Sequence, residues 1–156
     1  MSTVVTWQTD STSSEQTEQL AERLGKAIKG GEVLELVSDL GGGKTTFVRG
    51  LARGMGSIDR VTSPTFTISR IYEAGDLELH HFDFYRLHEA GLIAEELAEI
   101  IGDPKVVAVV EWGGVVKNVL PDKRLTITIE KTPSDGRRVM LRAPESLDYL
   151  IRAAHA

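Results

Sequence analysis

The chain has 156 residues, a formal net charge of −5 and no cysteine, and 41% of its residues are hydrophobic, which fits one globular domain over residues 1–156. The acidic balance argues against a free-standing nucleic-acid-binding protein, and the lack of cysteine excludes a disulfide framework, a thiolate metal site and a cysteine nucleophile. The N-terminus shows no secretory signal and no apolar run reaches membrane-spanning length, so we expect a cytoplasmic protein without membrane contact.

Seven short segments along the chain have the composition and alternation of strands. A turn at 74–76 joins two of them as a hairpin, and the continuous apolar run at 106–110 is typical of a strand buried on both faces. In chain order, the expected strands are 4–7, 33–37, 66–72, 77–83, 106–110, 125–129 and 138–141.

Apolar stripes with helical spacing lie between several of these strands. Ser13 and Gln16 have the spacing of a capping box, and they begin a helix that Gly30 and Gly31 end. Three more helices are expected, at 44–55, at 92–101 and in the last segment, with Pro144 near the start of the last one.

The run 41–46, Gly-Gly-Gly-Lys-Thr-Thr, lies between a predicted strand and a predicted helix, which is the context of a phosphate-binding loop. Glycines let backbone N–H groups turn toward phosphate oxygens, and the helix N-terminus adds further donors. Lys44 is expected to reach the β- and γ-phosphates, and the Thr45 hydroxyl to bind Mg²⁺. The general motif has glycine where this chain has Ser38, so we expect any departure at Ser38 to affect nucleotide affinity and not the fold.

Strands that alternate with helices around such a loop predict an α/β fold. The expected architecture is a P-loop NTPase-like three-layer sandwich. Its central sheet is mixed and has about seven strands, with a parallel centre, antiparallel hairpins and helices on both faces.

Two acids lie at the carboxyl ends of predicted strands, at the sheet edge where open α/β folds bind ligands. Glu111 is predicted to hold Mg²⁺ together with Thr45, directly or through water. Asp83 is predicted to accept a proton from an attacking water or to hold the water shell of the metal. His80 and His81 are expected to be neutral, hydrogen-bonded side chains rather than metal ligands.

Several residues near these motifs leave two interpretations open. Trp112 suits either core packing or a lid over the site. Thr62 and Thr65 either sense the γ-phosphate or belong to an ordinary Ser-Pro turn. Arg86 either contacts phosphate or pairs with an acid such as Glu89. No Asn-Lys-x-Asp string is present, which favours ATP over GTP.

The order and spacing of these motifs resemble the TsaE family, also called YjeE, of small bacterial ATPases. The resemblance runs from about Thr9 to Arg142. The matching strings are residues 39–46, 62–66, 81–86 and 111–112.

This resemblance implies an ATP-binding and ATP-hydrolysing subunit required for threonylcarbamoyladenosine modification of tRNA. It implies TsaB and TsaD as partners, with TsaD performing the transfer and tRNA contacted only through the complex. By position, Lys44 and Asp83 would be catalytic, and Thr45 and Glu111 would bind Mg²⁺. The implied cofactor-binding residues are Ser13, Ser14, Asp39, Leu40, Gly41, Gly42, Gly43, Lys44, Thr45, Thr46, Trp112, Gly136 and Arg137.

Two other functions remain open at this point. Ser38 motivates a nucleotide-gated assembly factor with negligible hydrolysis. A small-molecule kinase would need an acceptor pocket and an arginine-rich lid, and the sequence shows neither clearly.

Overall fold

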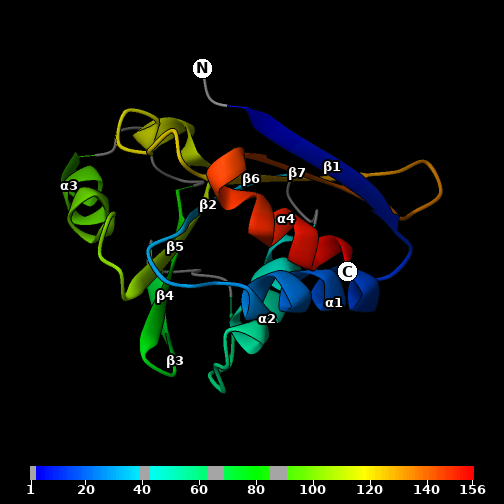
Figure 1. Ribbon diagram of the computed structural model, residues 1–156, viewed down its shortest axis with the longest axis horizontal. Helices are drawn as coiled ribbons and strands as arrows, with labels where there is room; N and C mark the ends of the chain where they lie inside the picture. Colours follow the sequence, from blue (N-terminus) through cyan, green and yellow to red (C-terminus); the bar gives the residue numbers. More distant parts are fainter. Residues whose placement is uncertain (1–2, 39–42, 63–68, 85–90) are drawn as a thin grey trace.

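A seven-stranded mixed sheet runs through the computed structural model, which describes residues 3–38, 43–62, 69–84 and 91–156 (Figure 1). The strand order is β1-β7-β6-β2-β5-β4-β3, and the four neighbours β6, β2, β5 and β4 run parallel. The strands are β1 Val4–Ser11, β2 Val33–Ser38, β3 Ser69–Ala74, β4 Leu77–Asp83, β5 Val106–Glu111, β6 Leu125–Lys131 and β7 Arg137–Pro144.

Antiparallel pairs complete the sheet at both edges, since β3 pairs with β4 and β1 and β6 both pair with β7. The number of strands in the described ranges, the parallel centre and the antiparallel hairpins are those predicted from the sequence, and the fold class is confirmed.

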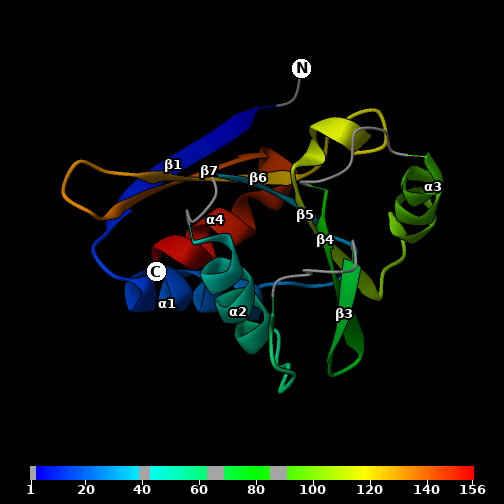
Figure 2. The same cartoon turned by 180° about the vertical axis from the view of Figure 1, so that it is seen from behind.

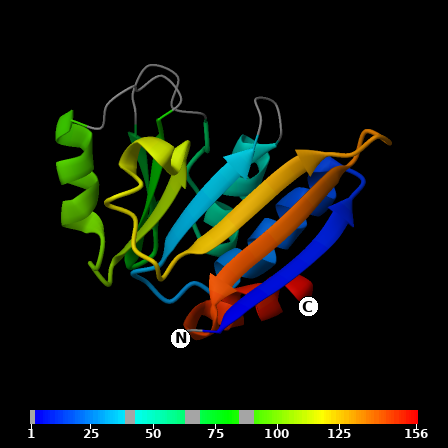
Figure 3. The same cartoon turned by 90° about the horizontal axis from the view of Figure 1, so that it is seen from above.

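Helices cover both faces of the sheet (Figures 1 and 2). One face carries α1, α2 and α4, while α3 and the 3-10 helix η1 lie against the other, and the view from above shows the long strands crossing over α1 and α4 (Figure 3). The helices are α1 Ser14–Lys26, α2 Lys44–Gly54, α3 Gly91–Ile100, η1 Gly113–Val116, η2 Glu145–Leu147 and α4 Asp148–His155. No helix within the described ranges is long and apolar enough to cross a membrane.

The apolar side chains buried on the two faces come from the predicted strands and helical stripes. On the α1 and α2 face, Leu36, Val109 and Ile127 of adjacent strands contact the cluster that includes Leu24 and Phe47. On the α3 face, the buried cluster consists of Val33, Phe82, Phe84, Leu97, Ala108, Val110, Val116 and Leu120. The run at 106–110 therefore faces both clusters, as its unbroken hydrophobicity predicted.

The two ends of the chain give one confirmation and one correction. The Ser13 side chain caps α1 by accepting from the Gln16 N–H (3.1 Å), and Gln16 Oε1 in turn accepts from the Thr12 N–H (2.8 Å).

The expectation that Pro144 lies early in the final helix is wrong. Pro144 has extended backbone, pairs with Val4 at the end of β7, and is separated from α4 by η2. Its fixed φ fits the end of a strand as well as the start of a helix.

Glycines bring α1 and α2 into close contact. A Cβ at Gly50 would run into the carbonyl oxygen of Glu18, and a Cβ at Gly54 would run into that of Glu22. The side chain that any other residue carries would push the two helices apart. This contact places the first turn of α1 beside the first turn of α2, where the predicted nucleotide-binding residues lie.

We predict that Gly50→Ala destabilises the protein although alanine favours a helix over glycine by about 1 kcal/mol. The clash with the α1 backbone should outweigh that gain and lower the free energy of unfolding by roughly 1–2 kcal/mol. Gly114→Ala is the matched control, because a Cβ there meets no atom within 4 Å, and it should stay close to wild type. Urea unfolding measures both, and a Gly50→Ala variant as stable as wild type would contradict the helix contact.

Candidate functional site

Three of the residues predicted to carry out catalysis or to bind the metal lie at the carboxyl ends of the parallel strands. Lys44 begins α2, which follows β2, while Glu111 ends β5 and Asp83 ends β4. The β4–β5 register places Asp83 directly beside Glu111. Parallel strands end at the same edge of the sheet, so residues 28 or more positions apart in sequence become neighbours there.

Glu111 is the centre of a buried charged cluster. One carboxylate oxygen, Oε1, lies 3.6 Å from Lys44 Nζ, and the other, Oε2, accepts a short hydrogen bond from His81 Nε2. The side chains of Lys44, Glu111 and His81 are only 9%, 3% and 0% exposed. An ionised carboxylate removed from water needs such partners, because its hydration is lost on burial.

His81 belongs to this cluster, although the sequence analysis gave it no role in the site. It was expected to be a neutral, hydrogen-bonded side chain, and the structure gives it a hydrogen bond to a charged group of the site. Its second ring nitrogen, Nδ1, is buried and has no hydrogen-bond partner among the described residues. A histidine at a fully buried strand position was the available signal, but naming Glu111 as its partner required the β4–β5 register.

Trp112 packs in the core and also contacts a residue of the site. It packs against the cluster on the α3 face of the sheet, and its ring centroid lies 4.6 Å from Lys44 Nζ. Its backbone is left-handed (φ 59°, ψ 46°), a conformation that a bulky residue rarely adopts and that costs of order 1 kcal/mol or more. This turn from β5 into η1 brings the indole ring against the Lys44 ammonium group, which favours a cation–π contact.

A cavity of about 240 Å³ joins three distant segments beside the start of α2. The β1–α1 corner, the α2 N-terminus and the β6–β7 turn all contribute to it. It brings together the predicted residues Ser13, Ser14, Gly43, Thr46, Gly136 and Arg137.

Three further lining residues of this cavity were not predicted. Ser11 and Thr17 face each other with their side-chain oxygens 2.8 Å apart, and Asp135 lies in the β6–β7 turn with positive φ (65°). Hydroxyl groups are common on protein surfaces, so nothing in the local sequence marked Ser11 or Thr17 as site residues.

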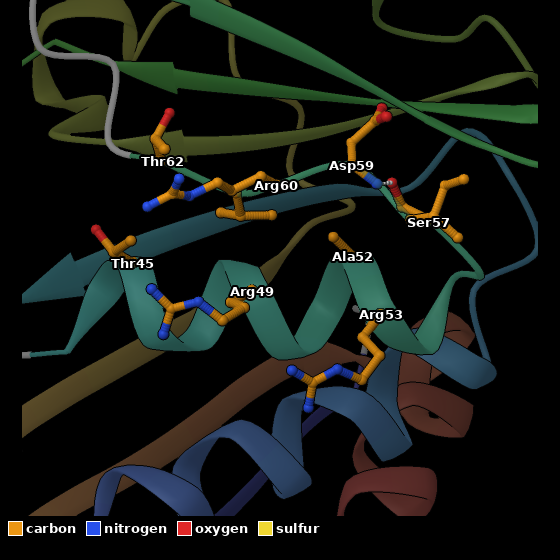
Figure 4. A pocket seen from close by; sticks show the side chains of 10 residues that line it. Thr45, Arg49, Ala52, Arg53, Ser57, Asp59, Arg60 and Thr62 are labelled. Atoms are coloured by element: carbon orange, nitrogen blue, oxygen red, sulfur yellow. Dashed lines mark hydrogen bonds between the residues drawn. The ribbon is translucent and has the colours of Figure 1, made fainter.

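On another side of the α2 N-terminus, Thr45 lies at one end of a larger cavity of about 710 Å³ (Figure 4). Segment 57–62 forms the opposite wall, and Thr62, for which the sequence left a γ-phosphate sensor or an ordinary turn open, lies on it near Thr45. The two adjacent threonines of the predicted loop, Thr45 and Thr46, therefore line different cavities.

Several predicted residues lie outside the described ranges, namely Asp39, Leu40, Gly41, Gly42, Thr65, Arg86 and Glu89. The predictions for them stay predictions. Ser38, the position that departs from the phosphate-loop motif, is described. It is the last residue of β2 and pairs with Ile129 of β6. The described non-glycine residues with positive φ are Trp112 and Asp135, so Ser38 has a backbone conformation that a side chain tolerates.

We predict that Glu111→Gln destabilises the folded protein in the absence of nucleotide, because Lys44 would remain buried without a carboxylate beside it. Removing one partner of a buried pair should lower the free energy of unfolding by about 3 kcal/mol. Glu78→Gln is the control, since its carboxylate also contacts a histidine, His80, but is half exposed. That change should cost less than about 1 kcal/mol. Equal urea midpoints for the two variants would argue against the buried cluster.

Comparison with known proteins agrees with the fold and the motifs. The family model described as threonylcarbamoyl adenosine biosynthesis protein TsaE matches residues 11–139. The chain is 38% identical over 130 residues to the tRNA threonylcarbamoyladenosine biosynthesis protein TsaE of Bacillus subtilis, a match that spans 83% of this chain and 80% of that protein. It is 39% identical over 132 residues to the protein of the same name from Treponema pallidum, over 82% of this chain and 93% of that one.

A solved structure shows the same similarity in three dimensions. The crystal structure of Bacillus subtilis YdiB matches this chain with a TM-score of 0.76 and 33% sequence identity, over 99% of this chain and 96% of that one. The family match covers the phosphate loop, the strand that carries His81 and Asp83, and the Glu111–Trp112 pair. The chain belongs to the TsaE family.

Proposed function

We propose that this chain binds and hydrolyses ATP as a subunit required for threonylcarbamoyladenosine modification of tRNA. It would act with TsaB and TsaD homologues, without being the transferase, and would contact tRNA only through that complex. The observation that carries this proposal is the meeting of Lys44, Glu111 and Asp83 at one sheet edge, in a chain whose relatives are named for this modification.

The α2 N-terminus would bind the phosphates. Its backbone N–H groups and positive dipole end favour anions, and Lys44 starts the helix with its ammonium group held inside the site. When phosphate oxygens arrive, the Lys44 ammonium group can exchange Glu111 for them. The exchange would release Glu111 Oε1 while His81 keeps the other carboxylate oxygen in place.

A magnesium ion at this edge would be held by Thr45 and Glu111. Thr45 and Glu111 offer the hard oxygen donors that Mg²⁺ prefers, and two protein ligands are enough where phosphates and water supply the rest. A bound Mg²⁺ would neutralise the charge of the phosphates while the γ-phosphoryl group is transferred to water. Asp83, beside Glu111 in the register, would accept a proton from the attacking water or hold the water shell of the metal.

The smaller cavity would hold the nucleoside end of ATP. It adjoins the α2 N-terminus through Gly43 and Thr46, and its hydroxyl groups and the Gly136–Arg137 turn offer both donors and acceptors. This position supports the roles expected for Ser13 and Ser14 from the family resemblance.

An assembly factor that binds ATP without hydrolysing it is the alternative function. Ser38 motivated that alternative, but its place at the end of β2 without positive φ gives no structural reason for weak binding. Separate measurements of nucleotide binding and phosphate release distinguish the two functions.

We predict that Lys44→Ala reduces ATP affinity at least about tenfold, since a charge-assisted contact to phosphate is lost. Asp83→Asn should leave affinity within a few-fold of wild type and reduce phosphate release by about 100-fold or more. Fluorescence of Trp112 in a Trp7→Phe background reports binding, and phosphate release is measured with purified TsaB and TsaD homologues. Lys26→Ala, on the last turn of α1, should behave as wild type. Nucleotide binding without any phosphate release above background would favour the assembly factor.

We predict that Ser38→Gly changes ATP affinity by less than about threefold, because the position needs no conformation reserved for glycine. The added backbone freedom should slightly lower stability, by about 0.5–1 kcal/mol. The same fluorescence titration measures the affinity. A gain of tenfold or more would show that the Ser38 side chain obstructs the phosphate loop.

A further inference from the structure

The larger cavity, between α2 and segment 57–62, has a wall chemistry that the proposed ATP site does not explain. Its described lining contains three arginines, Arg49, Arg53 and Arg60, against one acid, Asp59. This concentration of positive charge occurs in a chain whose net charge is −5. A local charge excess of the opposite sign to the whole protein selects an anionic ligand.

The arginines are available to such a ligand. Arg49 and Arg53 share a single carboxylate, Glu18 of α1, at 3.7 and 3.3 Å, and their side chains are 46% and 51% exposed. Arg60 makes no ion pair with any residue in the described ranges. Figure 4 shows Arg49 and Arg60 extending from opposite walls toward the end of the cavity where Thr45 and Thr62 lie.

Hydrogen bonds hold the second wall in place. The Glu73 N–H donates to Asp59 Oδ2 (2.9 Å), and the Tyr72 hydroxyl donates to the Thr62 carbonyl oxygen (2.9 Å). Both bonds fasten the segment to β3. The groove is therefore preformed, which lowers the ordering cost of binding.

An apolar side chain lies among these charges. Ile58, which lines the groove, is 99% exposed. A fully exposed isoleucine beside arginines matches a polypeptide that carries both acidic and apolar side chains. Ile58 offers little to a ribose-phosphate backbone, whereas an apolar side chain of a polypeptide can pack on it. The groove therefore favours an acidic protein segment over RNA.

We propose that the groove between α2 and segment 57–62 is the docking site for an acidic segment of a partner protein. Carboxylates of that segment pair with Arg49 and Arg60, and an apolar side chain packs on Ile58. This proposal rests on the proposed function in that the partner is sought in the complex of TsaB and TsaD homologues. The docked segment ends at Thr45 and Thr62, so it reaches the phosphate end of the nucleotide site.

The test measures binding of immobilised full-length chain to the purified complex of TsaB and TsaD homologues, to tRNA alone, and to ATP. Arg49→Glu/Arg60→Glu should weaken binding to the complex by about tenfold or more, with a shallower salt dependence than wild type. Arg49→Lys/Arg60→Lys should retain most of that binding. Arg152→Glu, on α4, is the matched charge-reversal control and should have no effect. Thermal unfolding confirms that each variant is folded.

The Ile58→Asp variant tests the apolar contact and leaves every arginine in place. It should also weaken binding to the complex. Unchanged binding in both the double-reversal and the Ile58 variants overturns the proposal. A loss of tRNA binding alone would identify the groove as an RNA site, and a comparable loss of ATP affinity would assign it to the nucleotide site. Both outcomes reject an acidic protein segment. Wild-type chain that hydrolyses ATP but does not bind the complex refutes the docking site while leaving the ATPase intact. A chain that binds the complex but does not hydrolyse ATP supports the docking site and refutes the proposed ATPase activity.

Discussion

A carboxylate buried at the end of a central strand has to be neutralised by the protein itself, because water no longer solvates it. Glu111 is in this position, and the elements around it are arranged accordingly. The β4–β5 register brings His81 to one oxygen, and the start of α2 brings Lys44 to the other. The Trp112 ring then lies against the same ammonium group. The cluster thus joins β4, β5 and α2 at the place where the phosphates are expected to bind.

The two cavities beside α2 have linings of different chemistry. The smaller one is lined by hydroxyl groups, glycines and the turn residues Asp135 and Arg137, which offer donors and acceptors to a nucleoside. The larger one is lined by arginines and opens near Thr45. One short helix therefore lines both cavities, with its first turn beside the proposed nucleotide site and its side facing the proposed docking groove.

Most of the fold was predictable from local patterns, and the parts that were not depend on long-range geometry. Alternation and apolar runs located the strands, and the Ser13–Gln16 spacing located the start of α1, because each signal lies within a few residues. The Lys-Thr pair after a glycine run is an equally local signal, and the phosphate binding that it predicts stays a prediction. The bond between His81 and Glu111 joins residues 30 positions apart, and only strand register brings them together. The arginine groove also depends on how separate elements pack, whereas the hydroxyl pair of Ser11 and Thr17 depends on the local turn from β1 into α1. Pro144 was misassigned because its φ suits two kinds of structure.

The glycine contact between α1 and α2 has a mechanical consequence. With no side chain between the two backbones, the helices have little freedom to slide and should move as one body. Arg49 on α2 and Ser13 at the head of α1 then belong to the same body, although they line different cavities. The arginine groove and the smaller cavity are therefore both built on the same closely packed pair of helices.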